Sequence, residues 1–440
     1  MKITFMGAGS TIFAKNVLGD TLLTPVLAEG LEIALYDIDK DRLDESYLVI
    51  TALNNKFNDG KAKIDRYYGV ENRKAALKGA RFVVDAIQVG LYDPCTILDF
   101  EIPKKYGLRQ TIGDTLGIGG IFRGLRTIHV LKDFARDMEE VCPDALLLNY
   151  TNPMAILTGY MLRHTGVNTI GLCHSVQVCA ASILNGVGMS DKLEGHREKI
   201  AGINHMGWLL EIEDKDGNDL YPEIRRRAYE KNRAEKHGNM VRFDYIEKFG
   251  YYCTESSEHN AEYNALYIKK DRPDVIEKYN IPLDEYPRRC INQIARWSKQ
   301  RDELMAGGNI SHTLSHEYAS RILNAVVTDT PERIGGNVLN NGLIENLPRE
   351  ACVEVPCLVD NKGIHPTYIG RLPVQCAAMN MTNINPQLLT IEAAATGKME
   401  HVYQAAMLDP HTGAILTADE CVAMCDELRA AHEAAGFPIF

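Results

Sequence analysis

The 440-residue sequence lacks a long hydrophobic run and an excess of basic residues. No apolar stretch approaches the ~18 residues that a membrane span requires. The N-terminal segment MKITFMGAGST is too short in its apolar part, and too rich in glycine, to be a signal peptide. The formal net charge of −11 disfavours nucleic acid and anionic membranes, because both bind basic surfaces. We therefore expect neither nucleic acid nor a membrane as partner.

The sequence also lacks a CxxC pair, an internal repeat and a low-complexity linker. Its eleven cysteines, an odd number, are scattered from Cys95 to Cys425. In a chain of this size such usage indicates reduced thiols and a cytoplasmic location rather than a disulfide framework. Without a linker, the two halves of the chain should share an extensive interface, where ligand sites tend to lie.

The first half of the chain alternates strand-like and helix-like segments. Strands are expected within residues 2–9, 31–39, 80–90, 145–153 and 168–176, and helices within 11–23, 41–57 and 122–141. Strands that are apolar on both faces imply a parallel sheet covered on both sides by helices. The pattern therefore predicts a Rossmann-like, doubly wound α/β domain over residues 1–195.

The second half, residues 196–440, predicts a mixed α+β domain that binds substrate and metal and mediates oligomerisation. A strand pair is expected within 195–214, and helices are expected within 221–236, 264–280, 285–306, 390–407 and 420–436. Together the two domains give an architecture like that of lactate or malate dehydrogenase. We expect a homodimer or a homotetramer.

A short glycine motif, FMGAGST, joins the first strand to the first helix. Gly7 permits the tight turn, and Gly9 lets the backbone approach a pyrophosphate. Ser10 and Thr11 begin the helix whose free N–H groups can bind the phosphates. The third position of the dinucleotide fingerprint is Ile12 where glycine or alanine is usual, so the motif is weak on its own.

The end of the second strand strengthens the prediction of a nucleotide site. Asp37 stands where an acid would bind a ribose 2′-hydroxyl, although Asp39 could be that acid, or a helix cap. An acid here favours NAD over NADP, whose 2′-phosphate it would repel. In NYTNP, Asn149 and Asn152 could bond a nicotinamide or a sugar hydroxyl, or simply form a turn before proline.

Polar side chains at further strand ends indicate a metal site. Cys173 and His205 lie 32 residues apart in GLCHSV and GINHMGW, with His174 and Asn204 beside them. A thiolate and a neutral imidazole form an incomplete coordination set that leaves positions open for substrate. Each residue taken alone is more typical of a protein core.

Seven segments together resemble glycoside hydrolase family 4, and within it the melibiase-type α-galactosidases. They are KITFMGAGSTIFAKN, QTIGDTLGIGGIFRGLRTI, NYTNPMA, GLCHSV, AGINHMGWLLE, YYCTESSEHNAEY and LDEYPRRC. The resemblance runs through essentially the whole chain. It implies hydrolysis of α-galactosides with NAD+ and a divalent metal, commonly Mn2+, rather than the usual two-carboxylate scheme.

In the mechanism that the resemblance implies, NAD+ oxidises the sugar at C3, which makes the C2 proton acidic. A base removes that proton, the metal stabilises the enediolate, and the glycosidic oxygen leaves with help from an acid. Water then adds and NADH returns the hydride.

The family's functional positions can be carried over to this sequence. The metal ligands fall on Cys173 and His205, and the acid falls on His174. Asn152 falls on a substrate-contacting asparagine, and Asp114 falls on a carboxylate that could either support the groups that contact the substrate or serve as a proton relay.

The base is harder to assign. Members that act on phosphorylated sugars use a tyrosine, and its position here is near Ser256, which is no base. Tyr263, Glu255, Glu258 and His259 are the candidates, and we favour Tyr263.

The substrate is expected to be a free sugar. Cys95 or Pro94 stands where phospho-sugar members carry the arginine that binds phosphate. Arg289, with Arg288 beside it, is a predicted substrate-binding residue. The pair could bind a uronate, which keeps an α-galacturonidase as an alternative. Two alternative functions belong to other classes of protein. An NAD-dependent 2-hydroxy acid dehydrogenase would accumulate NADH, and a non-catalytic NAD-binding sensor would show no turnover.

Overall fold

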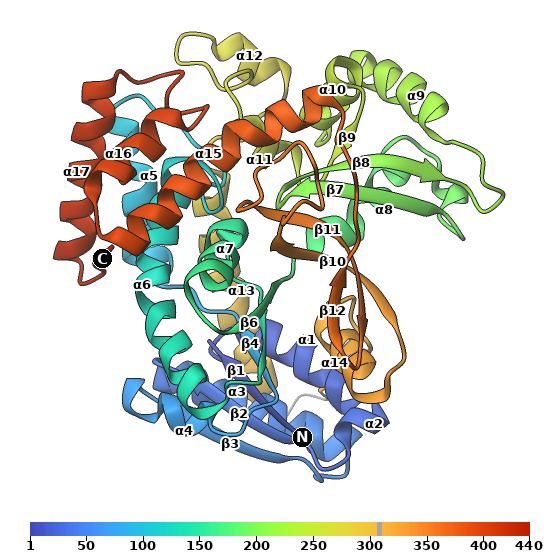
Figure 1. Cartoon of the computed structure of the whole chain (residues 1–440), viewed down its shortest axis with the longest axis vertical. Helices are drawn as coiled ribbons and strands as arrows, with labels where there is room; N and C mark the ends of the chain where they lie inside the picture. Colours follow the sequence, from blue (N-terminus) through green and yellow to red (C-terminus); the bar gives the residue numbers. More distant parts are fainter. Residues whose placement is uncertain (306–309) are drawn as a thin grey trace.

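The computed structural model describes residues 1–305 and 310–440 and contains one large mixed sheet surrounded by helices (Figure 1). The strands of this sheet are, in chain order, β1 Lys2–Met6, β2 Glu32–Asp37, β3 Lys63–Tyr68, β4 Phe82–Asp85, β5 Leu146–Asn149, β6 Asn168–Gly171, β7 Arg197–Ile203, β8 Met206–Glu213, β9 Tyr252–Cys253, β10 Glu332–Leu339, β11 Cys352–Asp360 and β12 Gly363–Pro366.

The spatial order is β3-β2-β1-β4-β5-β6-β10-β11-β7-β8-β9, and β12 pairs with β11. The strands from β3 to β6 are parallel, and from β10 onward the pairing is antiparallel. One continuous sheet therefore carries the chain from the nucleotide-binding half into the second half.

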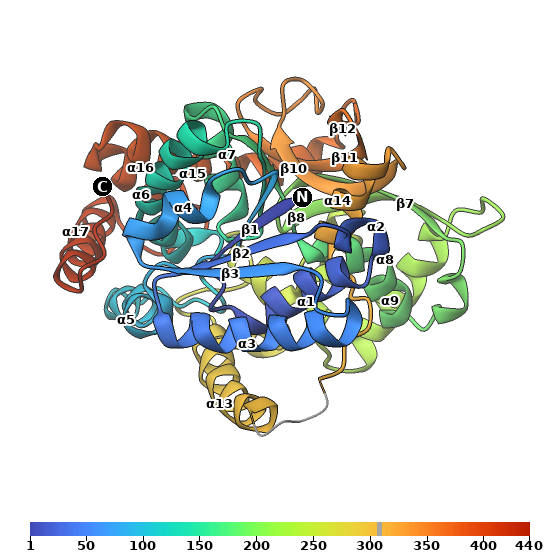
Figure 2. The same cartoon turned by 90° about the horizontal axis from the view of Figure 1, so that it is seen from below.

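The helices of the first half cover both faces of the parallel strands. Their bounds are α1 Thr11–Leu22, α2 Pro25–Ala28, α3 Lys40–Phe57, α4 Arg73–Leu77, α5 Ile97–Lys105, α6 Gly117–Val141, α7 Met154–His164 and α8 His174–Gly186, with short helical turns η1 Val70–Asn72, η2 Leu91–Thr96 and η3 Ser190–Lys192. Helices α1 and α3 lie on one side of β1 to β3, and α4 and α6 lie on the other (Figure 2). The alternation of side chains explains this, because Phe5 packs with the α1 and α3 core whereas Met6 packs with the α6 core. The predicted Rossmann-like, doubly wound sheet is confirmed.

The helices of the second half are α9 Tyr221–Ala234, α10 Met240–Phe249, α11 Ser257–Glu262, α12 Pro273–Lys278, α13 Glu285–Met305, α14 Tyr318–Thr328, α15 Val374–Thr396, α16 Met399–Leu408 and α17 Ala418–Ala434. Helix α13 projects from the body of the molecule (Figure 2). Residue 306, the end of the helix expected from the sequence, lies outside the described residues. No helix in the described ranges is long and apolar enough to cross a bilayer.

The helix predicted over residues 264–280 is wrong for most of its length. Only α12 is helical, because Pro273 disfavours a helical residue before it and begins the helix itself. Upstream, the side chain of Asn264 accepts a hydrogen bond from the Leu266 backbone, and the buried Tyr267 hydroxyl donates to Asp244. These contacts fix an irregular segment against α10. The helical region expected at 390–407 is divided into α15 and α16 by Gly397, which has φ +69°.

Candidate active site

The glycine turn after β1 lies at the carboxyl edge of the parallel strands, where ligands bind in this fold. Gly7 has φ +82°, and a Cβ there would lie 2.7 Å from the carbonyl oxygen of Ala86. A Cβ on Gly9 would lie 2.8 Å from the Asp37 carboxylate. Gly7 is therefore required by the backbone of the turn, whereas a side chain at Gly9 would displace the Asp37 carboxylate.

The structure separates the roles of the two acids after β2. Asp37 accepts hydrogen bonds from the backbone N–H of Gly9, at 2.6 Å, and of Asp39, at 2.9 Å. Asp39 instead caps α3 by accepting from the backbone of Asp41 and Arg42. Asp37 is therefore the acid that faces the glycine turn.

The other predicted cofactor residues differ in how free their side chains are. Ser10 is the residue before α1 and its side chain makes no capping hydrogen bond, whereas the Thr11 hydroxyl lies 2.7 Å from that of Ser46. Asn149 is buried, and its amide bonds the backbone of Thr151 and the hydroxyl of Thr158. The side chains of Thr11 and Asn149 thus shape the turns of the site.

Asn152, the predicted substrate residue, follows β5. Its side-chain oxygen is buried and has no hydrogen-bond partner among the described residues. Its carbonyl oxygen accepts from Nε of Arg123 at 3.3 Å. An unpartnered buried oxygen of this kind suits a ligand hydroxyl or amide.

Three side chains form the group best suited to a metal ion. The ligand atoms of Cys173, His205 and Glu255 all lie within 4.8 Å of one another. Nε2 of His205 is 3.4 Å from a carboxylate oxygen of Glu255. The structure thus brings together the predicted ligands Cys173 and His205 and adds a carboxylate that the sequence analysis considered only as a base.

Local structure explains how these residues are presented. Cys173 is the cap residue of α8, just beyond β6. His205 lies in the two-residue turn between β7 and β8 and has φ +64°, and Glu255 follows β9 with φ +63°. Left-handed backbone is uncommon for residues other than glycine, and such conformations are often retained at functional sites.

The electrostatics of this group favour a positive charge at its centre. Burial acts to lower the pKa of His205, but Glu255 and Cys173 raise it to about 10. Burial acts to raise the pKa of Glu255, but the neighbouring imidazoles of His205 and His259 lower it to about 2. The cluster therefore stabilises positive charge of the kind that a divalent cation would supply.

Tyr263 lies behind this group rather than in front of it. Its side chain is fully buried, and its hydroxyl is 3.0 Å from Nδ1 of His205. Burial raises the pKa of Tyr263 well above its usual value. The geometry suits a residue that orients the His205 ring more than one that takes a proton from substrate.

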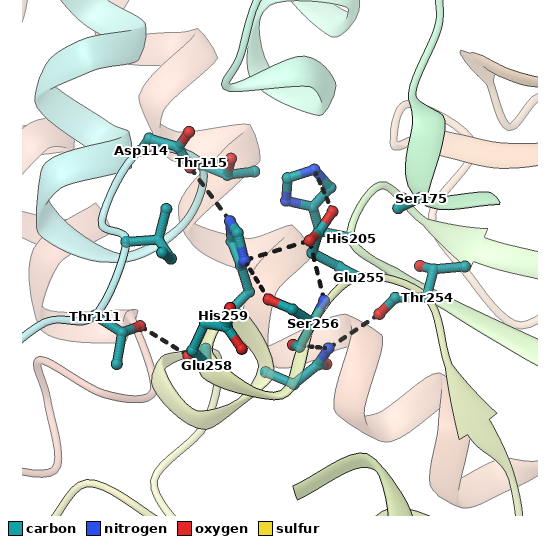
Figure 3. Close-up of polar contacts among 12 residues, drawn as sticks. Thr111, Asp114, Thr115, Ser175, His205, Thr254, Glu255, Ser256, Glu258 and His259 are labelled. Carbon is teal, nitrogen blue, oxygen red and sulfur yellow. Dashed lines mark hydrogen bonds and ion pairs between the residues drawn. The ribbon is translucent and has the colours of Figure 1, made fainter. Parts of the chain in front are cut away.

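A second set of polar side chains, which includes Asp114, lies beside His205 and Glu255 (Figure 3). Nδ1 of His259 is 2.8 Å from the Ser256 hydroxyl and 3.4 Å from Glu255, and Nε2 is 3.7 Å from Asp114. Burial alone would raise the pKa of Asp114, but His259 and Arg123 hold it well below its usual range. Asp114 is thus a carboxylate aimed at His259.

Most of the sequence matches the models of one protein family in two consecutive segments. The model for family 4 glycosyl hydrolases matches residues 2–189, and the model for the C-terminal domain of that family matches residues 200–412. The chain belongs to glycosyl hydrolase family 4. The predicted family is confirmed, and the domain boundary at residue 195 stays a prediction.

Relatives and solved structures agree with family 4. The chain is 61% identical over 431 residues to an alpha-galactosidase of Bacillus subtilis (strain 168), covering 98% of each. It superposes on a 6-phospho-beta glucosidase of Thermotoga maritima, solved with manganese, NAD+ and glucose-6-phosphate, with TM-score 0.77, 20% identity and 99% coverage of both chains. A malate dehydrogenase of Plasmodium falciparum gives TM-score 0.50 at 14% identity, covering 90% of this chain and 98% of that one. The predicted dehydrogenase-like architecture is therefore confirmed.

Arg289 lies at the rim of this family 4 site, on α13. Its guanidinium pairs with Glu258 and, at 3.0 Å, with Glu285. Glu285 also pairs with the neighbouring Arg288 at 2.8 Å. Each arginine therefore already has a carboxylate partner.

Three further residues, which no sequence pattern indicated, shape the family 4 site. Glu262 accepts from the backbone N–H of Thr111 and Gly113 and so holds the loop before Asp114. Arg123 contacts the Tyr286 hydroxyl at 3.3 Å. Glu317 lies 2.6 Å from Nε2 of His174, and this hydrogen bond raises the pKa of His174 above its usual value. None of the three stands in a pattern that indicates its partner.

Proposed function

We propose that this family 4 protein is an NAD+- and Mn2+-dependent α-galactosidase that acts on free α-galactosides by transient oxidation at C3, elimination and addition of water. The observation that carries the proposal is the cluster of Cys173, His205 and Glu255 at the edge of a dinucleotide-binding sheet. Identity of 61% with an alpha-galactosidase over nearly the whole chain supports the choice of substrate.

The residues of the cluster fit a divalent metal ion. Cys173 and His205 would hold it, with Glu255 as an additional carboxylate donor, whose oxygen is the ligand type that suits Mn2+. When bound, the ion would act as a Lewis acid toward sugar oxygens. Tyr263 keeps the tautomer of His205 whose Nε2 can bind the metal.

The glycine turn fits NAD+. Gly7 and Gly9 form the tight turn before α1, and no capping side chain at Ser10 covers the N–H groups of the first helical turn, which starts at Thr11 and can therefore bind a pyrophosphate. Asp37 supplies the carboxylate for a ribose hydroxyl. When bound, NAD+ would accept and later return a hydride at C3 of the sugar.

We assign proton abstraction from C2 to the pair Ser256 and His259 rather than to Tyr263. Glu255 lies 3.4 Å from the metal-facing nitrogen of His205, which assigns it to the ion. His259 is largely buried, but Ser256 is a partly exposed residue, and its hydroxyl bonds His259 and can convey the proton to it. Asp114 compensates the charge that His259 gains.

His174 is assigned the leaving-group proton. It stands next to the ligand Cys173 at the start of α8, and half of its side chain is exposed. It can therefore reach the glycosidic oxygen of a sugar held at the metal, while the free oxygen of Asn152 contacts a sugar hydroxyl.

The ion pairs of Arg289 favour a neutral sugar as the substrate. Arg289 could contact the substrate, but its charge is matched by Glu258 and Glu285. A galacturonide carboxylate would have to compete with both acids. We therefore favour the galactoside over the galacturonide.

The cysteines support the proposed compartment. All eleven are unpaired, and a cysteine ligand must remain reduced. We propose that the protein acts in the cytoplasm. The homodimer or homotetramer stays a prediction.

The proposal is tested by hydrolysis of p-nitrophenyl α-galactoside with NAD+, Mn2+ and a thiol reductant, omitting each component in turn. We expect nitrophenol release that needs all three, without net NADH. Turnover of an α-galacturonide alone would keep the mechanism and change the substrate. Steady accumulation of NADH would instead indicate a dehydrogenase.

A further inference from the structure

A buried carboxylate from a distant part of the chain holds the ring of His174. Oε2 of Glu317 lies 2.6 Å from Nε2 of His174. The Glu317 side chain is 8% exposed, whereas that of His174 is 52% exposed. Glu317 therefore fixes Nε2 of the accessible His174 ring, and Nδ1 is the nitrogen left for a ligand.

Aromatic contacts limit the other motions of this ring. The ring centroid of His174 lies 6.3 Å from that of Phe13 and 6.1 Å from that of Tyr150. Phe13 belongs to α1 and Tyr150 directly follows β5, so both come from the nucleotide-binding edge of the sheet. A flip of the imidazole would break the hydrogen bond to Glu317.

The segment that carries Glu317 is itself anchored to α1. Asp20 of α1 is 1% exposed, and its carboxylate bonds Nε2 of His312 at 2.8 Å and the backbone N–H of Ser315 at 2.9 Å. The Ser315 hydroxyl also donates to Asp20 and accepts from the backbone N–H of Glu317 at 3.1 Å. Glu317 is thus held rigidly relative to the helix that carries Phe13.

We infer that Glu317 is a positioning residue that orients His174 toward the leaving group of the substrate. The inference rests on the proposed function. A carboxylate on Nε2 fixes the tautomer and direction of an imidazole, as in other acid–base pairs.

In the elimination step, the C1–O bond breaks and its electron pair goes to the glycosidic oxygen. That oxygen takes the proton from Nδ1 of His174 and departs as an alcohol. When water adds to C1 of the enone, Nδ1 takes the proton of the water, so the residue returns to its starting state. Glu317 stays ionised throughout and compensates the positive charge of the ring.

The chemistry of the leaving group tests this role. A nitrophenolate can leave without a proton, whereas an alkoxide cannot. We compare kcat/KM of the wild type and Glu317→Gln on p-nitrophenyl α-galactoside and methyl α-galactoside, with NAD+ and Mn2+ present. Loss of a general acid costs about 10²-fold or more. We expect such a fall for the methyl glycoside and less than a threefold change for the nitrophenyl glycoside.

Glu332→Gln is the matched control, because Glu332 of β10 forms a surface ion pair with Arg321 of α14. It should behave as the wild type on both substrates. If Glu317→Gln does not fold, as judged by circular dichroism, Glu317→Asp replaces it, because aspartate keeps the charge but its shorter side chain reaches less far. In Glu317→Asp, kcat/KM for the methyl glycoside should again fall more than kcat/KM for the nitrophenyl glycoside, but by a smaller factor.

Equal losses on both substrates, or none, would overturn the role of Glu317 while leaving the α-galactosidase proposal intact. A wild type that cleaves neither glycoside would overturn the proposed function and this inference with it.

Discussion

The hydroxyl of Tyr263 lies 3.0 Å from Nδ1 of His205, and both side chains are buried. This contact leaves Nε2 of His205 directed at the position between Cys173 and Glu255. A tyrosine in that place contacts the His205 ring and has no exposed surface for a sugar.

Tyr263→Phe should weaken Mn2+ binding about 10- to 100-fold, because outer partners of metal ligands commonly contribute that much. Isothermal titration of the purified protein with Mn2+ measures the change. The matched control is Tyr252→Phe, which removes the hydroxyl of another fully buried tyrosine, bonded to Ser182 and Asn239. An unchanged dissociation constant in Tyr263→Phe would contradict the assignment.

The assignment of the base leads to a second prediction. His259→Gln should lower solvent deuterium incorporation at C2 of the sugar by about 10²-fold or more, because a general base is lost. Tyr263→Phe at saturating Mn2+ should incorporate deuterium at close to the wild-type rate. Mass spectrometry of the galactose released in D2O measures both. If the phenylalanine variant alone loses the exchange, Tyr263 is the base, as the sequence predicted.

The contact of Asp37 with the glycine turn predicts cofactor choice. Asp37→Ser removes the carboxylate that faces a ribose hydroxyl, so NAD+ should bind about tenfold more weakly, and the preference over NADP+ should narrow. Asp39→Asn is the control, because asparagine keeps the cap of α3 and should leave NAD+ affinity unchanged. Fluorescence titration with NAD+ and with NADP+ measures both affinities. If Asp37→Ser keeps the preference for NAD+ that the wild type shows, another group selects the cofactor.

The sequence predicted the parallel half of the fold because its central strands are apolar on both faces. It missed β3, an edge strand of sequence KIDRYY whose side chains are half-buried or exposed. Such a strand carries no continuous apolar run, so its place depends on pairing with β2. The sequence also left Asp37 and Asp39 as alternatives for the acid that binds the ribose hydroxyl. Only the contacts of Asp37 with Gly9 and of Asp39 with α3 distinguish them.

The candidate site could be predicted where its residues stand in motifs at strand ends. Cys173 and His205 were found in this way. The partner of His174, Glu317, lies 143 residues further along the chain and is delivered by the start of α14. Pairings of this kind depend on the tertiary fold, and the sequence around each residue gives no sign of them.

The rim of the site predicts discrimination against acidic sugars. Glu258 and Glu285 neutralise Arg289, so p-nitrophenyl α-galacturonide should be cleaved with a kcat/KM at least about 10²-fold below that of the galactoside. Glu258→Gln should narrow the gap roughly fivefold to tenfold by releasing part of the arginine charge. Glu332→Gln, distant from Arg289, should not. Equal kcat/KM values for the two wild-type substrates would instead support the galacturonidase.

The buried carboxyl of Glu354 on β11 predicts how stability depends on pH. It is 1% exposed, its Oε1 accepts from Asn337 at 3.0 Å and from Asn204 at 3.3 Å, and its Oε2 has no hydrogen-bond partner in the described ranges. Burial raises the pKa of Glu354 from 4.5 to about 7. The folded protein therefore binds this proton more tightly than the unfolded chain does.

The stabilisation by the protonated form is complete below about pH 4.5 and is lost as the pH rises through about 7. Glu354→Gln carries no such proton. Between pH 5 and pH 8 the wild type should therefore lose up to about 3 kcal/mol of unfolding free energy relative to the variant. Urea unfolding of both proteins across this range measures the difference, and Glu332→Gln should follow the wild type. Parallel curves for wild type and Glu354→Gln would mean that Glu354 is already ionised in the folded protein.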